Sequence, residues 1–123
     1  MNSSKTLHEL CDALGVTRRA VQGYEKEGLV SASGKNKYGH LLYDEKSQKR
    51  IAQIRLYQQF GFKVKEIKYL MEAPDNEIRE AIGKQMVHLK AERARIDALI
   101  EKANELLNAS KVDNNSYEGG KKL

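Results

Sequence analysis

Two arginines and a glutamine stand close together near the N-terminus, as Arg18, Arg19 and Gln22. An arginine can hydrogen-bond to guanine edges or to phosphates, and a glutamine can pair with adenine. The start of a helix also favours anions, because its first amide groups have no partner inside the helix. These residues are therefore candidate contacts to a nucleic acid. The alternative is a solvated surface without a role, and for Gln22 the two interpretations weigh equally.

A tyrosine and a basic loop follow these residues in the chain. Tyr24 can donate its hydroxyl to a phosphate while its ring packs on the domain, or serve in packing alone. Lys35, Lys37 and Tyr38 lie in a polar stretch, where positive charge beside an aromatic ring suits a phosphate or minor-groove contact. A flexible solvated loop is the alternative, and we favour the contact.

The net charge of +5 is unevenly distributed along the chain. Residues 1–71 hold 13 Lys and Arg against 7 Asp and Glu, whereas residues 72–123 hold 9 against 10. A concentrated positive region attracts polyanions such as nucleic acids. Lys63 and Lys65 stand at the start of a predicted helix, where positive charge opposes the helix dipole. This local mismatch favours a functional role for both lysines.

No residue pattern indicates catalysis or metal binding. The single cysteine, Cys11, cannot form an internal disulfide, and we expect it to be a small packing residue. His8, His40 and His88 are too scattered in sequence to suggest a metal cluster. The sequence also shows no carboxylate pair, no nucleophile with a base and no glycine-rich phosphate loop. We therefore expect no enzymatic activity, no metal and no cofactor.

Two short helices position the first candidate residues. Thr6 and Glu9 have the spacing of a capping box, so a helix is predicted to begin there and to end at Gly15. Thr17 is the next N-cap, and its helix is predicted to end near Gly28. Two short helices joined by a tight turn that contains glycine are typical of a helix-turn-helix.

A small wing and two further helices are predicted next. Residues 31–40 are rich in turn formers and basic groups and lead into a strand-like run at 41–43, which predicts a two-stranded wing. Asp44 is positioned to cap a third helix that ends at Gly61, and a fourth helix follows. The apolar positions expected in these two helices are Ile51, Ile54, Leu56 and Phe60, then Val64, Ile67, Leu70 and Met71.

A long helix is predicted after Pro74, with Asp75 as its cap. Its apolar positions alternate at steps of four and three, which is a heptad repeat. The stripe consists of Ile82, Met86, Leu89, Arg93, Ile96, Ile100, Ala103 and Leu107. A helix over 75–109 would be about 50 Å long, and the small preceding domain cannot cover such a stripe. We therefore expect a second copy of the chain to cover it.

These elements predict a mainly α fold, in which a winged helix-turn-helix domain at 1–72 precedes a coiled-coil dimerisation helix at 75–109. The polar residues 110–123 are expected to be disordered. No apolar run approaches the roughly 18 residues that span a bilayer, and no signal-peptide pattern is present. We expect a cytoplasmic protein that does not bind membranes.

The chain resembles the MerR family of bacterial transcriptional regulators from Thr6 to about Leu107. The resemblance rests on four segments in the same order and at the same spacing, namely residues 14–17, 24–30, 38–43 and 60–68. It implies a second helix in the major groove, a hairpin wing, and a second wing from the third and fourth helices. It also implies an antiparallel coiled-coil homodimer on a palindromic promoter site, distortion of the DNA, and contact with RNA polymerase.

The sequence departs from the family pattern in two places. Family members carry an arginine and then an aromatic residue or histidine before the tyrosine of the second helix, where this chain has Gln22 and Gly23. The arginine of the family's wing strand is replaced by Leu41. Base readout is therefore expected to differ, and Lys35 or Lys37 is expected to replace the missing phosphate contact.

In an antiparallel pair, Arg93 would lie close to the two-fold axis. Burying two arginines there is costly unless the partner supplies carboxylates, for which Glu92 and Asp97 are candidates. Ile96 and Ile100 are expected to supply the apolar burial that holds the dimer.

The sequence therefore predicts a DNA-binding transcriptional regulator that acts as a homodimer on double-stranded DNA. Two alternatives remain open at this point. The first is an architectural or excisionase-like DNA binder, and the second is a coiled-coil adaptor whose basic domain binds an acidic protein.

Overall fold

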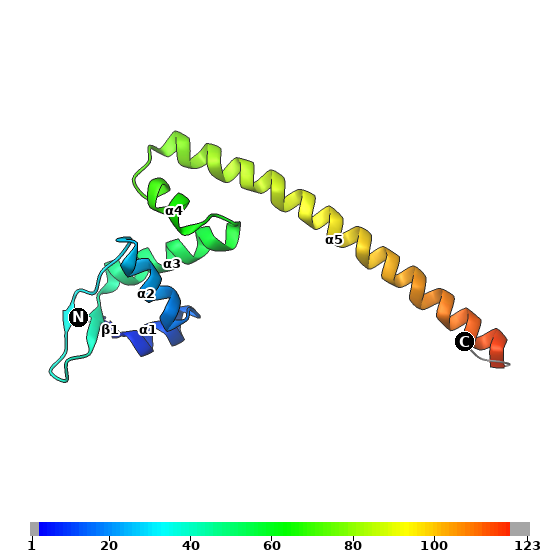
Figure 1. The fold of residues 1–123 in the computed structure, drawn as a ribbon, viewed down its shortest axis with the longest axis horizontal. Coiled ribbons are helices and arrows are strands. Elements are labelled where there is room, and N and C mark those ends of the chain that lie inside the picture. Colours follow the sequence, from blue (N-terminus) through cyan, green and yellow to red (C-terminus); the bar gives the residue numbers. More distant parts are fainter. Residues whose placement is uncertain (1–2, 119–123) are drawn as a thin grey trace. The chain divides into compact units, whose positions relative to one another are not determined.

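The computed structural model describes the backbone of residues 3–118 and the side chains of residues 3–109. It divides into two compact units, which we call the head, up to Ile82, and the distal helix, from Gly83 onward. The element order is β1 (Lys5–Thr6), α1 (Leu7–Leu14), α2 (Arg18–Lys26), β2 (Gly34–Lys35), β3 (Leu41–Tyr43), α3 (Glu45–Phe60), α4 (Val64–Leu70) and α5 (Asp75–Glu118) (Figure 1). This is the mainly helical winged helix-turn-helix architecture predicted from the sequence.

The first two helices begin and end at the predicted residues. The Thr6 hydroxyl accepts from the Glu9 amide at 3.3 Å, and the Glu9 carboxylate accepts from the Thr6 amide at 2.9 Å. The hydrogen bond from the Thr6 backbone holds the pKa of Glu9 below its ordinary value. Gly15 ends α1 at φ 66°, a conformation that glycine adopts without strain. Thr17 caps α2 through a hydrogen bond from the Ala20 amide.

The later helices also begin and end with hydrogen bonds between residues that are close in the sequence. Asp44 accepts from the Ser47 amide at 2.9 Å, and Gly61 ends α3 at φ 111°. The Lys63 amide donates to the Glu66 carboxylate at 2.8 Å where α4 starts. At the start of α5 the carbonyl of Pro74 accepts the first helical hydrogen bonds. The predicted cap, Asp75, is instead the first residue of that helix.

The wing contains one strand more than the hairpin that the sequence predicts. The sheet order is β1-β3-β2, with both pairings antiparallel. Lys5 pairs with Tyr43 in one ladder, and Lys35 pairs with Leu41 in the other. The two-residue strand β1 joins the wing to the start of α1, so the wing is anchored to the helix-turn-helix instead of extending as a free hairpin.

One apolar core holds the head together. Its fully buried side chains come from four helices and the wing strand, and the largest are Tyr24, Tyr43, Leu10, Ile51, Ile54, Ile67 and Val21. Of the apolar positions that predicted α3, Leu56 lies outside this core, because it is 47% exposed. Tyr57 is buried in its place and meets the Phe62 ring edge-on at 6.0 Å. The face of α3 that carries Ile54 therefore turns Tyr57 inward and Leu56 toward solvent.

Helix α5 extends to Glu118, beyond the end predicted at residue 109. Its first turns belong to the head, where Ile78 and Ile82 pack partly buried against the core. The predicted disorder of 110–123 stays a prediction, because residues 119–123 and all side chains from 110 onward lie outside the described residues. Among the described residues, no helix is long and apolar enough to span a membrane.

Candidate nucleic-acid interface

Helix α2 presents its polar face to solvent because its opposite face is anchored in the core. Val21 and Tyr24 are buried, whereas Arg18, Arg19 and Gln22 are all exposed. Among the described side chains, neither Arg18 nor Arg19 forms an ion pair. Both guanidinium groups are therefore available to a ligand. A DNA phosphate or a base edge would supply the acceptors that arginine prefers.

A groove of about 610 Å³ separates this helix from the wing. Arg18 and Gln22 line one side, and His40 and Leu41 from the wing line the other. Leu7 and His8 from the start of α1 complete the walls. The groove brings together residues that lie far apart in the sequence, and it adds His40, for which the sequence indicated no DNA contact.

The wing is held in shape by one asparagine. The side-chain Oδ1 of Asn36 accepts from the Tyr38 amide at 2.9 Å and from the His40 amide at 3.0 Å. This arrangement leaves Lys35, Lys37 and Tyr38 exposed, with Tyr38 at 71%. The ammonium of Lys37 lies 5.2 Å from the centre of the Tyr38 ring, within the range of a cation–π contact. The wing therefore offers positive charge and an aromatic surface together, as predicted.

Tyr24 does not lie on this exposed surface. Only 2% of the residue is exposed, and its hydroxyl donates to the Gln58 carboxamide oxygen at 2.5 Å. Burial raises the pKa of the Tyr24 hydroxyl above its ordinary value. The packing alternative is thus the one that the structure favours, because a hydroxyl that already has an acceptor inside the head has no proton left for a phosphate.

Lys63 and Lys65 are both exposed at the start of α4, and no ion pair is recorded for either among the described side chains. The Lys63 side chain makes no capping hydrogen bond. The two lysines are therefore free to contact an anion, as their position in the sequence predicts.

A buried hydrogen bond joins the wing to α2. The hydroxyl of the fully buried Tyr43 donates to the Glu25 carboxylate at 2.7 Å. Burial, reinforced by this hydrogen bond, raises the pKa of Tyr43 well above its ordinary value. The contact holds β3 and α2 together, so it helps to set the angle between the wing and the exposed arginines. It joins residues 18 positions apart, a separation that leaves no local spacing signal in the sequence.

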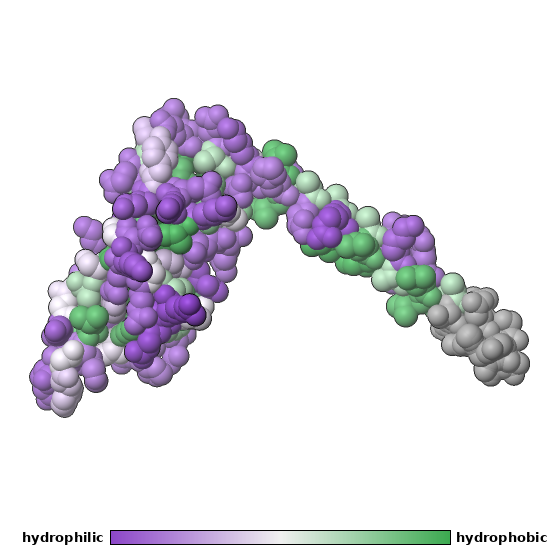
Figure 2. Space-filling view, in the orientation of Figure 1, coloured by the Kyte–Doolittle hydropathy of each residue, from purple (hydrophilic) through white to green (hydrophobic). Residues whose placement is uncertain are grey.

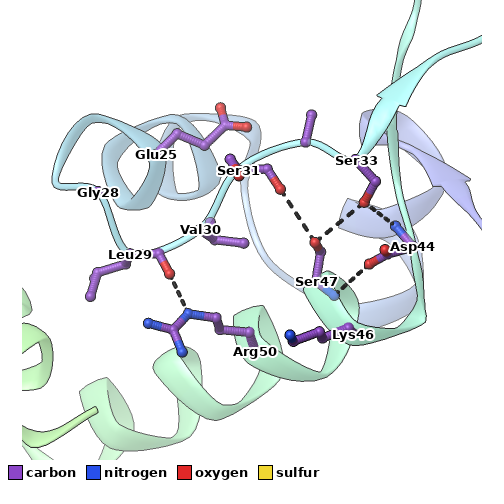
Figure 3. Close-up of a pocket in the computed structure, with 11 residues that line it drawn as sticks. Glu25, Gly28, Leu29, Val30, Ser31, Ser33, Asp44, Lys46, Ser47 and Arg50 are labelled. Atoms are coloured by element: carbon purple, nitrogen blue, oxygen red, sulfur yellow. Dashed lines mark hydrogen bonds between the residues drawn. The ribbon is translucent and has the colours of Figure 1, made fainter. Parts of the chain in front are cut away.

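The loop between α2 and the wing is tied to α3 by side-chain hydrogen bonds (Figure 3). The Arg50 Nε donates to the carbonyl of Leu29, and the Ser47 hydroxyl donates to the carbonyl of Ser31 at 3.2 Å. Arg50 also lies 3.9 Å from the Glu72 carboxylate, just before α5. These bonds give the loop carbonyls their hydrogen-bond partners, and they hold the segment between α2 and the wing against α3.

The described residues hold no group of three or more His, Cys, Asp or Glu that could bind a metal ion. Cys11 packs partly buried against the core, and burial raises the pKa of its thiol. The exposed chemistry of the head is thus cationic and aromatic.

Comparison with known protein families assigns this chain to a family. The chain matches the family described as MerR HTH family regulatory protein over residues 5–74 and the family described as MerR, DNA binding, over residues 48–109. The chain belongs to the MerR family. This family consists of transcriptional regulators, which are not enzymes.

Curated MerR relatives match this chain over part of their length. The nodulation protein NolA of Bradyrhizobium elkanii is 33% identical over 104 residues, which cover 85% of this chain and 47% of NolA. The HTH-type transcriptional activator mta of Bacillus subtilis is 26% identical over 93 residues, or 76% of this chain and 36% of mta. The chain therefore spans about half or less of the length of these relatives.

Solved MerR structures share the fold. HiNmlR, a MerR family regulator lacking the sensor domain, superposes with a TM-score of 0.75 at 18% identity, covering 95% of this chain and 92% of HiNmlR. A MerR family regulator from Bacillus cereus gives a TM-score of 0.70 at 24% identity, covering 88% and 83%.

Both departures from the MerR pattern lie on the same groove. Gln22 lines it from α2, and Leu41, which is 39% exposed, lines it from β3. An amide and an aliphatic side chain therefore stand where MerR proteins carry charge. Lys35 pairs with Leu41 across the wing ladder, so a lysine remains beside the vacated arginine position.

Proposed function

We propose that this chain is a sequence-specific transcriptional regulator that binds a palindromic promoter site as a homodimer and distorts the DNA. The observation that carries the proposal is the exposed pair Arg18 and Arg19, held on the outer face of α2 beside a cationic wing. In helix-turn-helix proteins the first residues of the second helix reach base edges in the major groove. The proposed DNA contacts are Arg18, Arg19, Gln22, Lys35, Lys37, Tyr38, Lys63 and Lys65.

Structural relatives support promoter DNA as the ligand. HiNmlR, which lacks a sensor domain, has been solved bound to promoter DNA. EcmrR, with a TM-score of 0.64 at 21% identity over 89% of this chain and 40% of that one, has been solved on DNA within an EcmrR-RPo complex. We extend to this chain both promoter binding and contact with RNA polymerase, and we place the activity in the cytoplasm, where bacterial DNA lies.

A homodimer is the second part of the proposal. The stripe on the distal helix leaves Met86, Ile96 and Ile100 between 43% and 54% exposed. A soluble chain rarely leaves such a row of large apolar side chains uncovered. A second copy of the same stripe covers it and also places two heads on one duplex, as a palindrome requires.

Selection of bound sites from random duplex DNA tests the proposal. The expected result is a palindrome whose half-sites lie about one or two helical turns apart, with binding that weakens as salt rises. Duplex binding without sequence preference would instead support an architectural role. A chain that binds no DNA but captures an acidic protein would support the adaptor alternative, and transcription from a promoter carrying the selected site would separate a regulator from an architectural protein.

A further inference from the structure

The distal helix exposes an apolar stripe together with charges that no neighbour on the same helix neutralises. Every side chain from Met86 to Ala109 is exposed. Figure 2 shows hydrophobic residues recurring along this helix, with hydrophilic ones between them. Among the described side chains, no ion pair is recorded for Lys90, Arg93 or Asp97. Arg93 lies within the stripe near its centre, and Lys90 and Asp97 flank it there.

Two antiparallel copies of the stripe match completely at only one position of the two-fold axis. In an antiparallel coiled coil, the first core position of one heptad faces the second core position of the partner. Pairing by this rule matches all eight stripe positions when the two-fold axis passes between Ala94 and Arg95. A slide of one heptad in either direction leaves two of the eight positions on each helix without a partner. The pairs in the complete register are Ile82 with Leu107, Met86 with Ala103, Leu89 with Ile100, and Arg93 with Ile96.

The same register brings opposite charges together beside the axis. Lys90 and Asp97 occupy equivalent flanking positions in successive heptads, and such positions face one another in an antiparallel pair. Each Lys90 then lies opposite the partner's Asp97, so the two-fold symmetric dimer contains two such ion pairs. Arg93 lies on the same flank, so the partner's Asp97 also answers the charge that would otherwise be buried near the axis.

Glu92 is not the partner carboxylate, although the sequence made it a candidate. Its carboxylate lies 2.6 Å from the Arg95 guanidinium of its own helix and accepts a second hydrogen bond from Arg95 at 3.2 Å. The pKa of Glu92 is lowered by this bond, consistent with a carboxylate that already has its counter-ion. Asp97 is therefore the carboxylate left for the partner.

A parallel pair would set like charges against each other. It would place Arg93 opposite the partner's Arg93 in one core layer. It would also place Glu92 opposite the partner's Asp97 across the flank. Like charges at such close range disfavour that orientation, so the charges as well as the apolar stripe select the antiparallel arrangement.

We propose that the distal helices of the homodimer, antiparallel as the family resemblance implies, pair in the register centred between Ala94 and Arg95. Lys90 and the partner's Asp97 lock this register. This inference rests on the proposed homodimer and adds its register and its specificity pair.

A charge-swap cycle tests the ion pair in the full-length protein. Lys90→Glu and Asp97→Lys are each expected to raise the dimer dissociation constant by about 3- to 30-fold, because each turns two weak attractions into repulsions. The double variant restores opposite charges at these two positions and is expected to dimerise more tightly than either single variant. Its recovery is partial, because the partner's new lysine repels Arg93. Lys102→Glu, on the outer face of α5, is the matched control and should leave the constant unchanged. The ion pair would be overturned if the single variants dimerised as tightly as the original chain. It would also be overturned if the double variant dimerised more weakly than either single variant.

Spin labels test the register directly in a Cys11→Ala background. Labels at Ala91→Cys and Ala98→Cys are expected to show equal separations across the dimer, each offset along the axis by about 10 Å, and a label at Glu105→Cys an offset of about 32 Å. A one-heptad slide would make the first two offsets differ by about 21 Å, and a parallel pair would make all three separations equal. Either result would overturn the register while leaving the dimer intact. A chain that sediments as a monomer would instead overturn the proposed dimer itself.

Discussion

The head and the distal helix solve the problem of apolar burial in different ways. The head turns Leu10, Ile51 and Ile54 inward until none of their surface is exposed. The distal helix leaves Leu99 and Ile100 54% exposed and Leu106 71% exposed. The head buries its apolar side chains within one chain, whereas the distal helix leaves its apolar stripe exposed.

The charges of the two regions differ in the same sense. Residues 1–71 of the head hold 13 Lys and Arg against 7 Asp and Glu, and this positive excess is suited to an external polyanion. On the distal helix acids and bases alternate, and Arg95 with Glu92 shows that they pair at close range. The charge of the head therefore suits a different molecule, whereas the mixed charges of the distal helix suit the proposed pairing with a second copy.

The largest effect is expected from placing charge on the apolar stripe. Ile96→Glu together with Ile100→Glu should give a monomer with a folded head. It should bind the selected palindrome about 100- to 10,000-fold more weakly yet keep half-site binding, because two linked heads gain from high effective concentration. Sedimentation and a binding titration measure both effects. Ala91→Glu with Ala98→Glu, on the outer face, is the control, and a stripe variant that still sediments as a dimer would contradict the assignment of the seam.

Opening a cavity in the head should have the next largest effect. Ile51→Ala removes three carbons from a fully buried site and is expected to lower the free energy of unfolding by about 2–5 kcal/mol. Leu56→Ala changes a 47% exposed residue of the same helix and should cost less than about 1 kcal/mol. Urea titrations of both variants measure the difference. Equal losses would mean that α3 does not turn the face described here toward the core.

Removing one arginine from α2 should have a smaller and more selective effect. Arg19→Ala is expected to weaken binding to the selected site by about 1–3 kcal/mol while affecting unrelated duplexes less, if the guanidinium reads a base. Lys26→Ala, in the last turn of the same helix, is the control for loss of charge. Equal weakening on every duplex would assign Arg19 to phosphates instead.

The smallest effect is expected at the wing and is read from salt dependence. Lys35→Ala with Lys37→Ala should reduce the slope of log affinity against log salt by about 1–2 units, because fewer counterions are released on binding. Titrations at several salt concentrations measure it, with Lys102→Ala on α5 as the control. If the slope did not change, the wing lysines would not contact the backbone.

Much of the helix-turn-helix could be predicted because its signals are local. The caps at Thr6, Thr17 and Asp44 each bind an amide three residues away, and Gly15 and Gly61 end helices through their own backbone freedom. The exposure of Arg18 and Arg19 follows from the same helical periodicity. The heptad spacing of the distal helix is likewise a property of neighbours along one helix.

Only the tertiary structure decided the contacts between distant segments. The strand β1 exists because Lys5 meets Tyr43, and a two-residue strand has no pattern of its own. Tyr24 lies in the core with its hydroxyl on Gln58, 34 residues away, so its place among the candidate DNA contacts could not be judged from its neighbours. Spacing along a helix defines which residues share a face, but which face meets the core depends on elements that the chain brings together only when it folds.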